Sequence, residues 1–150
     1  MKKMFSLILL IMCLTGCESL DSSDTMSFQE QGDFRIELST VSEYSGSENI
    51  MINSVFTYKG ENQLTIWSTP SYHTFIIEDI DGNFVYVEEQ VYVETKHILE
   101  PNTKYEFSIN STDVYLPKGE YVVTSEVRFS MGEKKNEIII ISTQISFKIK

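Results

Sequence analysis

Cysteine is scarce in this sequence. Only Cys13 and Cys17 are present, and none follows them in the remaining chain. The part after residue 17 therefore has no intrachain disulfide, no cysteine-ligated metal and no cysteine nucleophile. Its stability has to come from a hydrophobic core.

Basic residues are also few. Twelve Lys and Arg stand against twenty-two Asp and Glu, which gives a formal net charge of −10. Surfaces that bind nucleic acid or anionic lipid headgroups need clustered positive charge, so we expect no nucleic acid partner. An acidic surface is common in exposed soluble domains, so the charge by itself indicates no particular ligand.

Histidine occurs only twice, at His73 and His97, and neither has a cysteine or a second histidine at metal-ligand spacing. We expect both to be ordinary, half-exposed side chains. The serines form neither a Gly-x-Ser-x-Gly nor a Ser-x-x-Lys pattern. The sequence therefore predicts no enzyme, no cofactor and no metal; a deep polar pocket holding either histidine with two carboxylates would favour an enzyme instead.

A long hydrophobic run is absent too. The apolar stretch 4–14 is about half the roughly 20 residues that cross a bilayer. Lys2 and Lys3 precede it and the small residues Thr15 and Gly16 follow it, which is the layout of a secretory signal peptide. We expect residues 1–16 to target the chain for export and to be removed.

The tetrad Leu14-Thr15-Gly16-Cys17 resembles the bacterial lipobox. This resemblance implies a lipoprotein in which Cys17 carries a diacylglyceryl group and attaches the chain to the extracytoplasmic face of the cell membrane. Two acyl chains make a stable anchor. The alternatives are an ordinary signal peptide that leaves a free thiol, or a short buried segment of a cytosolic protein.

Residues 17–32 are mostly polar, with Leu20, Met26 and Phe28 as the apolar side chains. Such a stretch buries too little surface to order itself. We therefore expect a flexible tether, whose root-mean-square reach as a random coil is about 20 Å.

Residues 33–150 alternate apolar and polar side chains with a period of two, which indicates half-buried strands. Asp81-Gly82 between apolar flanks predicts a hairpin turn. Seven to nine short strands with turn signals every eight to twelve residues predict a single all-β domain, an antiparallel β-sandwich.

Two aromatic residues favour an immunoglobulin-like sandwich. Trp67 falls on the third predicted strand, where such domains bury a tryptophan in the core. Tyr121 follows Pro117-Lys118-Gly119-Glu120 at the entry of the next-to-last strand, which predicts a tyrosine corner. Val123 stands where an antibody domain has its second cysteine.

From about residue 53 to 129 the pattern resembles the β-sandwich family named for an intracellular proteinase inhibitor of bacilli. The resemblance is carried by Asn53–Tyr58, Phe75–Asp79 with Asp81-Gly82, Pro101 before Tyr105–Phe107, and Leu116–Tyr121. It implies a sandwich with an interaction role and, as an alternative function, proteinase inhibition. No reactive-site loop can be matched residue by residue.

Two groups of polar residues contain carboxylates at close spacing. Asp79, Asp81 and Asn83 suggest a calcium loop, but Gly82 and Gln90 do not occupy the positions an EF-hand requires, so a hairpin turn is preferred. Glu88 and Glu89 would point to opposite faces of a strand and cannot flank one bond. With Glu94, they are expected to be solvated.

Tyrosine is frequent, which fits either a binding surface or cross-strand pairs. We expect a non-enzymatic module that binds a protein or peptide through the loops at one end of the sandwich or through a sheet edge. The candidate loops are two turns: Lys59, Gly60, Glu61 and Asn62, and Met131, Gly132, Glu133, Lys134, Lys135 and Asn136.

Overall fold

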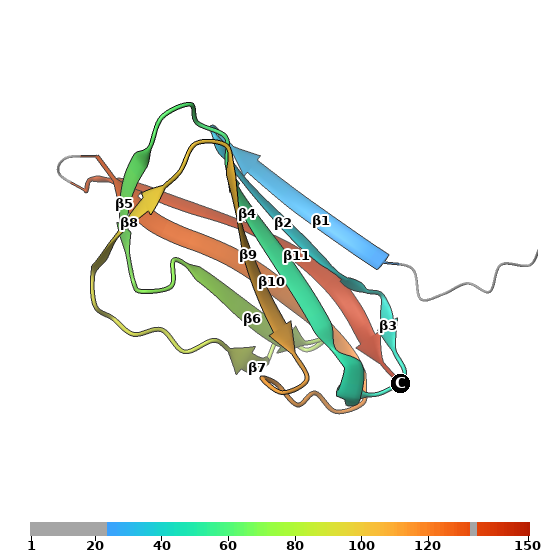
Figure 1. Cartoon of the computed structure of the whole chain (residues 1–150). Helices are drawn as coiled ribbons and strands as arrows, with labels where there is room; N and C mark the ends of the chain where they lie inside the picture. The colour runs from blue at the N-terminus through green and yellow to red at the C-terminus, as the bar shows by residue number, and fades with distance from the viewer. Residues whose placement is uncertain (1–23, 133–134) are drawn as a thin grey trace, which may run out of the picture.

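The structure is a computed structural model that describes residues 24–132 and 135–150 (Figure 1). Within these ranges the chain forms eleven strands in two sheets and one short 3-10 helix, η1 (Ser47–Asn49). The predicted all-β sandwich is therefore confirmed. The predicted signal peptide, Cys17, Glu133 and Lys134 lie outside the described residues. No helix in the described ranges is long and apolar enough to cross a membrane.

The smaller sheet, sheet A, has four antiparallel strands. In spatial order they are β1 (Asp24–Gln31), β2 (Phe34–Val41), β4 (Met51–Tyr58) and β9 (Thr103–Asn110).

The larger sheet, sheet B, is organised around a long hairpin of two 13-residue strands, β10 (Gly119–Met131) and β11 (Glu137–Ile149). One edge of β11 carries the short parallel strand β3 (Glu43–Tyr44). The other side of β10 pairs with two strands in succession, as Figure 1 shows. These are β6 (His73–Asp79), itself paired with β7 (Phe84–Val87), and β5 (Leu64–Ser68), itself paired with β8 (Thr95–Leu99).

The pairing of β4 with β9 in one sheet, and of β5, β10 and β11 in the other, is the arrangement of an immunoglobulin-like sandwich. The predicted tyrosine corner is present, because the Tyr121 hydroxyl donates a hydrogen bond of 2.7 Å to the Pro117 carbonyl oxygen. Val123 is fully buried beside it.

The strand count exceeds the predicted seven to nine partly because of β1. The expectation of a flexible tether over residues 17–32 is wrong for Asp24–Gln31, which pair with β2 along their whole length. An edge strand needs little apolar surface, since its backbone hydrogen bonds to a neighbour and only one face contacts the core. Here the inward Ser27 hydroxyl lies 2.7 Å from that of Thr143 on β11.

The core fills the space between the two sheets and follows the sequence alternation. On β11 every second side chain from Ile139 to Ile149 is buried, and the residues between them are exposed. Aromatic rings occupy one half of the core, where Phe34, Phe56 and Phe129 contact one another with centroids 5.1–6.1 Å apart. This rigid interior fixes the outer face of sheet B, on which the candidate site lies.

Candidate binding groove

The site arises from a mismatch in chain length beside β10. Val127 of β10 is opposite His73, and Ser130 is opposite Trp67. The two β10 residues in between therefore face five residues, 68–72, on the neighbouring chain. Because five residues do not fit opposite two, the chain bends away from β10 between Ser68, which still pairs with Thr95 on β8, and Tyr72, whose carbonyl oxygen accepts a hydrogen bond from the Arg128 N–H. This bend forms one side of a groove.

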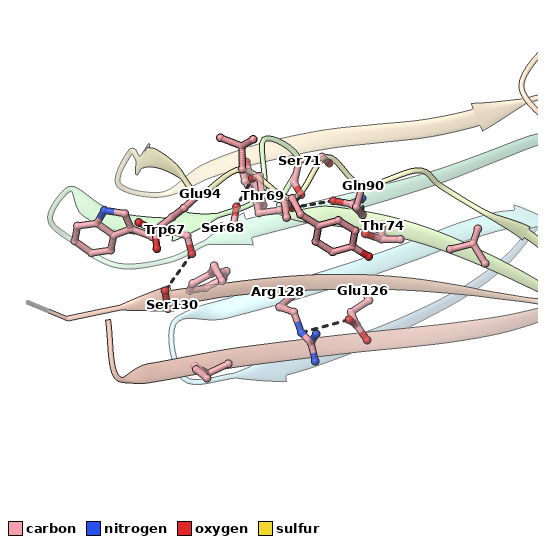
Figure 2. Close-up of a pocket in the computed structure, with 16 residues that line it drawn as sticks. Trp67, Ser68, Thr69, Ser71, Thr74, Gln90, Glu94, Glu126, Arg128 and Ser130 are labelled. Carbon is pink, nitrogen blue, oxygen red and sulfur yellow. Dashed lines mark hydrogen bonds and ion pairs between the residues drawn. The ribbon is translucent and has the colours of Figure 1, made fainter. Parts of the chain in front are cut away.

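The floor of the groove is the outer face of sheet B. Trp67, Ser130 and Ile138 form one row across three strands. The next rows along β10 place Arg128 beside Ile140, and Glu126 beside Thr74. Figure 2 shows Arg128 and Glu126 on this floor, with Trp67 at one end of the groove.

A second wall is the segment that follows β7. β7 ends at Val87, and residues 88–94 are irregular. Gln90 holds this wall in place: its amide nitrogen donates to the Thr74 hydroxyl over 2.8 Å, and the Thr69 hydroxyl donates to its side-chain oxygen over 2.8 Å. No sequence pattern indicates this role, because a lone glutamine matches no motif.

The groove has a volume of about 560 Å³ and is rich in exposed apolar side chains. Tyr92 is 91% exposed, and Val87, Val93 and Ile138 on its walls and floor are each at least half exposed. Ile140 is also exposed and extends the same face. A concave surface with several exposed apolar side chains on one face is typical of a binding site rather than of an ordinary solvated sheet.

Charged groups at the groove are largely matched within it. Arg128 Nε lies 4.0 Å from the Glu126 carboxylate. Lys135 forms an ion pair with Glu94, and its Nζ lies 5.3 Å from the centroid of the Trp67 indole. The groove therefore offers apolar area with a few polar groups and no strong net charge. Such a site suits a polypeptide segment better than a polyanion.

The prediction that Trp67 is a core residue is wrong. On β5 the side chain of Ile66 is fully buried, so its neighbour Trp67 points to the outer face and is only half-buried. Trp67 thus occupies the strand at which immunoglobulin domains place a tryptophan but turns the indole into the groove. Simple alternation, applied to Ile66, would have placed it correctly.

The prediction of half-exposed histidines is correct for His97 and wrong for His73. His73 is 1% exposed, stacks on Phe107 with centroids 4.1 Å apart, and its Nε2 lies 2.8 Å from Ser125 Oγ. Burial lowers the pKa of His73 to about 3, so the imidazole is neutral at physiological pH. His97 is half-buried, and its Nε2 lies 3.1 Å from the Thr69 carbonyl oxygen.

The contact of His73 with Ser125 brings an imidazole and a hydroxyl together in the interior, where both side chains are buried. Ser125 is fully buried, and its hydroxyl also lies 2.6 Å from that of Ser54 in the opposite sheet. The three side chains form a closed polar contact between the sheets. In the described residues no three His, Cys, Asp or Glu side chains are grouped to hold a metal ion.

The acidic candidates have separate roles. Asp79 organises the predicted hairpin turn, because its carboxylate accepts hydrogen bonds from the Asn83 side chain and from the backbone of Asp81 and Asn83. These bonds, above all that from the Asn83 side chain, lower the pKa of Asp79. Glu88 is half-buried and accepts a hydrogen bond from the Phe75 backbone, and burial raises its pKa. Glu89 is exposed.

The two predicted binding turns lie at the same end of the sandwich, since Ile66, shortly after the first turn, pairs with Met131 at the start of the second. The first turn is tied down: the Tyr58 hydroxyl donates to the Asn62 carbonyl oxygen, and Lys59 pairs with Glu30. None of the described turn residues lines the groove, although Lys135 contacts Trp67 at its rim.

The tyrosines divide between core and surface. Tyr44, Tyr58 and Tyr121 are buried, and Tyr72, Tyr86 and Tyr105 are half-buried. Tyr72 also lines the groove, and burial raises its pKa to about 12. Most of the tyrosines therefore pack between or along the sheets, and Tyr92 is the exposed one that lies at the groove.

Comparison with known proteins identifies no family. No family model and no curated protein matches the sequence. Among solved structures, a structural genomics target, SoR45, has a TM-score of 0.43 at 16% identity, over 81% of this chain and 90% of that one. A β-glucuronidase of Bacteroides uniformis has a TM-score of 0.37 at 14% identity, over 75% of this chain and 13% of the enzyme.

A β-glucosidase of Listeria innocua in complex with isofagomine has a TM-score of 0.37 at 8% identity. It matches over 85% of this chain and 16% of the enzyme. The chain thus spans only a small part of the glycosidases that it resembles.

Proposed function

We propose that this protein is a membrane-anchored, exported lipoprotein whose immunoglobulin-like sandwich binds a segment of another protein in the groove between Trp67 and Arg128. The groove, which presents exposed apolar side chains on the outer face of sheet B, is the observation that carries this proposal.

The position of the groove suits a tethered protein. An acylated Cys17 would be seven residues from Asp24, where β1 begins, and that length of extended chain spans at most about 24 Å. β1 belongs to sheet A, whereas the groove lies on the outer face of sheet B. The anchor therefore leaves the layer opposite the groove, which keeps the groove open to partners.

The chemistry of the groove favours a polypeptide ligand. Val93 on the wall and Ile138 on the floor offer apolar contacts, and Trp67 and Tyr92 provide large aromatic surfaces. Ser130, Gln90 and Arg128 supply hydrogen-bonding groups among them. Aromatic residues and arginine are the side chains that contribute most to protein interfaces.

Site-specific photo-crosslinking in the host tests the binding proposal. A photoreactive amino acid at Tyr92 should attach to one polypeptide partner, and Trp67→Ala should reduce the yield several-fold. The matched control is Tyr115, which is 77% exposed and does not line the groove. Equal adducts from both positions, or adducts with lipid alone, would contradict the proposal.

The anchor is tested separately by intact mass measurement of the protein from its host. We expect the mass of a chain that begins at a diacylated Cys17. A free thiol at this position, or a chain that still carries Met1, would contradict the anchor without affecting the binding result.

Proteinase inhibition is a second candidate function. It is favoured by the irregular wall 88–94, which presents Tyr92 to solvent as an exposed loop residue. A protease with a hydrophobic specificity pocket would accept an aromatic side chain of this kind. Inhibition of such a protease by the wild type and by Tyr115→Ala, but not by Tyr92→Ala, would support this function; full protease activity with micromolar protein would exclude it.

A further inference from the structure

The last strand, β11, has a free edge. Lys148 N–H donates to the Ser42 carbonyl oxygen, and Lys150 N–H donates to that of Tyr44, both on the side away from β10. The β10–β11 pairing has no bulge, so the even-numbered residues 138–146 direct their N–H and C=O groups to this same side. No strand in the described part of the chain pairs with them there.

This edge lacks the features with which proteins block strand addition. The segment Ile138–Phe147 has ten residues without a charged side chain, a proline or a glycine. Two other edge strands differ: β9 carries exposed Lys104 and Glu106, and β8 has only five residues and includes Lys96. A long, regular and uncharged edge is a template for pairing with another strand.

We propose that two copies of this protein associate through β11, with the two β11 strands antiparallel about a two-fold axis. The free residues 138–146 are centred on Ser142. The symmetric register that pairs all of them places Ser142 opposite its own copy, Ile140 opposite Gln144, and Ile138 opposite Ser146. Each of these opposed pairs exchanges two main-chain hydrogen bonds, about ten in total.

Charge favours a second copy in this orientation. β11 begins at Glu137 and ends beside Lys148 and Lys150. An antiparallel copy brings Glu137 of one strand near Lys148 of the other, which also pairs with Glu120 of its own chain, and the uncharged middle meets itself without repulsion. A parallel copy would place like charges side by side.

The dimer can form between two copies on one membrane. This placement depends on the lipid anchor proposed above. The two Asp24 residues would lie at opposite ends of the joined sheet. If sheet A faces the membrane, linkers of about 24 Å let both anchors reach the same leaflet. The two grooves then share the outward face and lie toward opposite ends of the paired β11 strands.

Cysteine crosslinking in host membranes tests this pairing, because the mature acylated chain has no free thiol of its own. In Ser142→Cys the two thiols sit on directly opposed residues about 5.5 Å apart at Cα, within disulfide reach. Mild oxidation should convert most of this variant to a dimer on a non-reducing gel. Wild type should remain monomeric on the gel. A disulfide-linked wild-type dimer would show that Cys17 carries a free thiol, which would contradict the proposed lipid anchor and not the β11 pairing.

Ser146→Cys is the matched control, since it is the same substitution on the same exposed face of β11. Its two thiols would be about 26 Å apart along the paired strands and should not crosslink. The double variant Ile138→Cys with Ser146→Cys should regain the dimer, because these positions are opposed. Absence of the Ser142→Cys dimer, equal dimer from Ser146→Cys, or linkage to a different polypeptide would overturn the proposal.

Discussion

His73 lies parallel to Phe107, with ring centroids 4.1 Å apart and 5° between the ring planes. Its Nε2 faces the hydroxyl of Ser125, and Phe75 contacts the ring edge-on. No charged side chain is among these contacts. An imidazole held in this way is stable only in its neutral form, and this has a consequence for stability in acid.

We expect the fold to lose stability as the pH falls below about 6.5. Below this pH the His73 side chain is protonated in the unfolded chain but stays neutral in the native protein. The folded pKa is about 3. The contribution of His73 to the free energy of unfolding is therefore complete above the histidine pKa of the unfolded chain, about 6.5. It decreases by about 1.4 kcal/mol per pH unit between this pKa and the folded pKa. Urea unfolding from pH 7.5 to 4 measures this slope.

His73→Phe should remove that part of the slope, whereas His97→Phe should keep it. The exposed carboxylates that also respond to acid are common to all three proteins, so the difference between variants isolates His73. Identical slopes for wild type and His73→Phe would show that the buried imidazole does not control the acid response.

Tyr121→Phe should lower the free energy of unfolding by about 1 kcal/mol, the usual contribution of one hydrogen bond. The variant loses the bond to the Pro117 carbonyl oxygen but keeps the ring, which stacks on Phe147 at a centroid distance of 5.7 Å. Tyr115→Phe is the control, since Tyr115 is 77% exposed, and its effect should be within about 0.5 kcal/mol. Chemical denaturation compares the two, and equal effects would mean that the corner bond does not contribute.

Gly60→Ala should destabilise the fold by about 1–3 kcal/mol, as is usual for overpacking. A Cβ at this position would lie 2.0 Å from the Tyr58 hydroxyl oxygen. The Tyr58 ring cannot move freely, because it is buried against Phe34 and hydrogen-bonded to the Asn62 carbonyl oxygen. Gly46→Ala, which meets no atom within 4 Å, is the matched control in thermal unfolding. A Gly60→Ala protein as stable as this control would show that the turn adjusts at no cost.

Hydrogen exchange distinguishes a strand from a tether at residues 24–31. Because β1 pairs with β2 from Asp24 to Gln31, about half of its backbone amides should be protected in the full chain. Mass spectrometry of peptides from this region gives the result directly. Exchange as fast as that of an unstructured peptide would show that residues 24–31 are a flexible tether and that the folded domain begins at about residue 33.

Much of the fold follows from local pattern. Alternation of apolar and polar residues locates most strands, as on β11, where the buried residues from Ile139 to Ile149 are every second one. Asp81-Gly82 and Pro117 mark a turn and a corner that the structure contains, with Gly82 at a positive φ of 81°. These features are legible because the pleat and the turn geometry each demand particular residues at fixed spacing.

The groove was not predictable in the same way, because it depends on how many residues separate contacts on two different strands. Five residues face two beside Arg128, and this count exists only once β5 and β6 are both paired with β10. Gln90 and Thr74, which join the wall to the floor, are 16 positions apart and match no motif.

The sequence by itself determined an all-β chain with an export signal pattern, an acidic composition and an alternating core, since each depends on residue type and spacing. Tertiary structure decided the rest. Trp67 points to the outer face beside the buried Ile66, and the polar segment Asp24–Gln31 pairs with β2 as the strand β1. Most of one edge of β11 has no paired strand among the described residues. These outcomes depend on which strands meet, and the pairing of distant strands is settled only when the two sheets pack together.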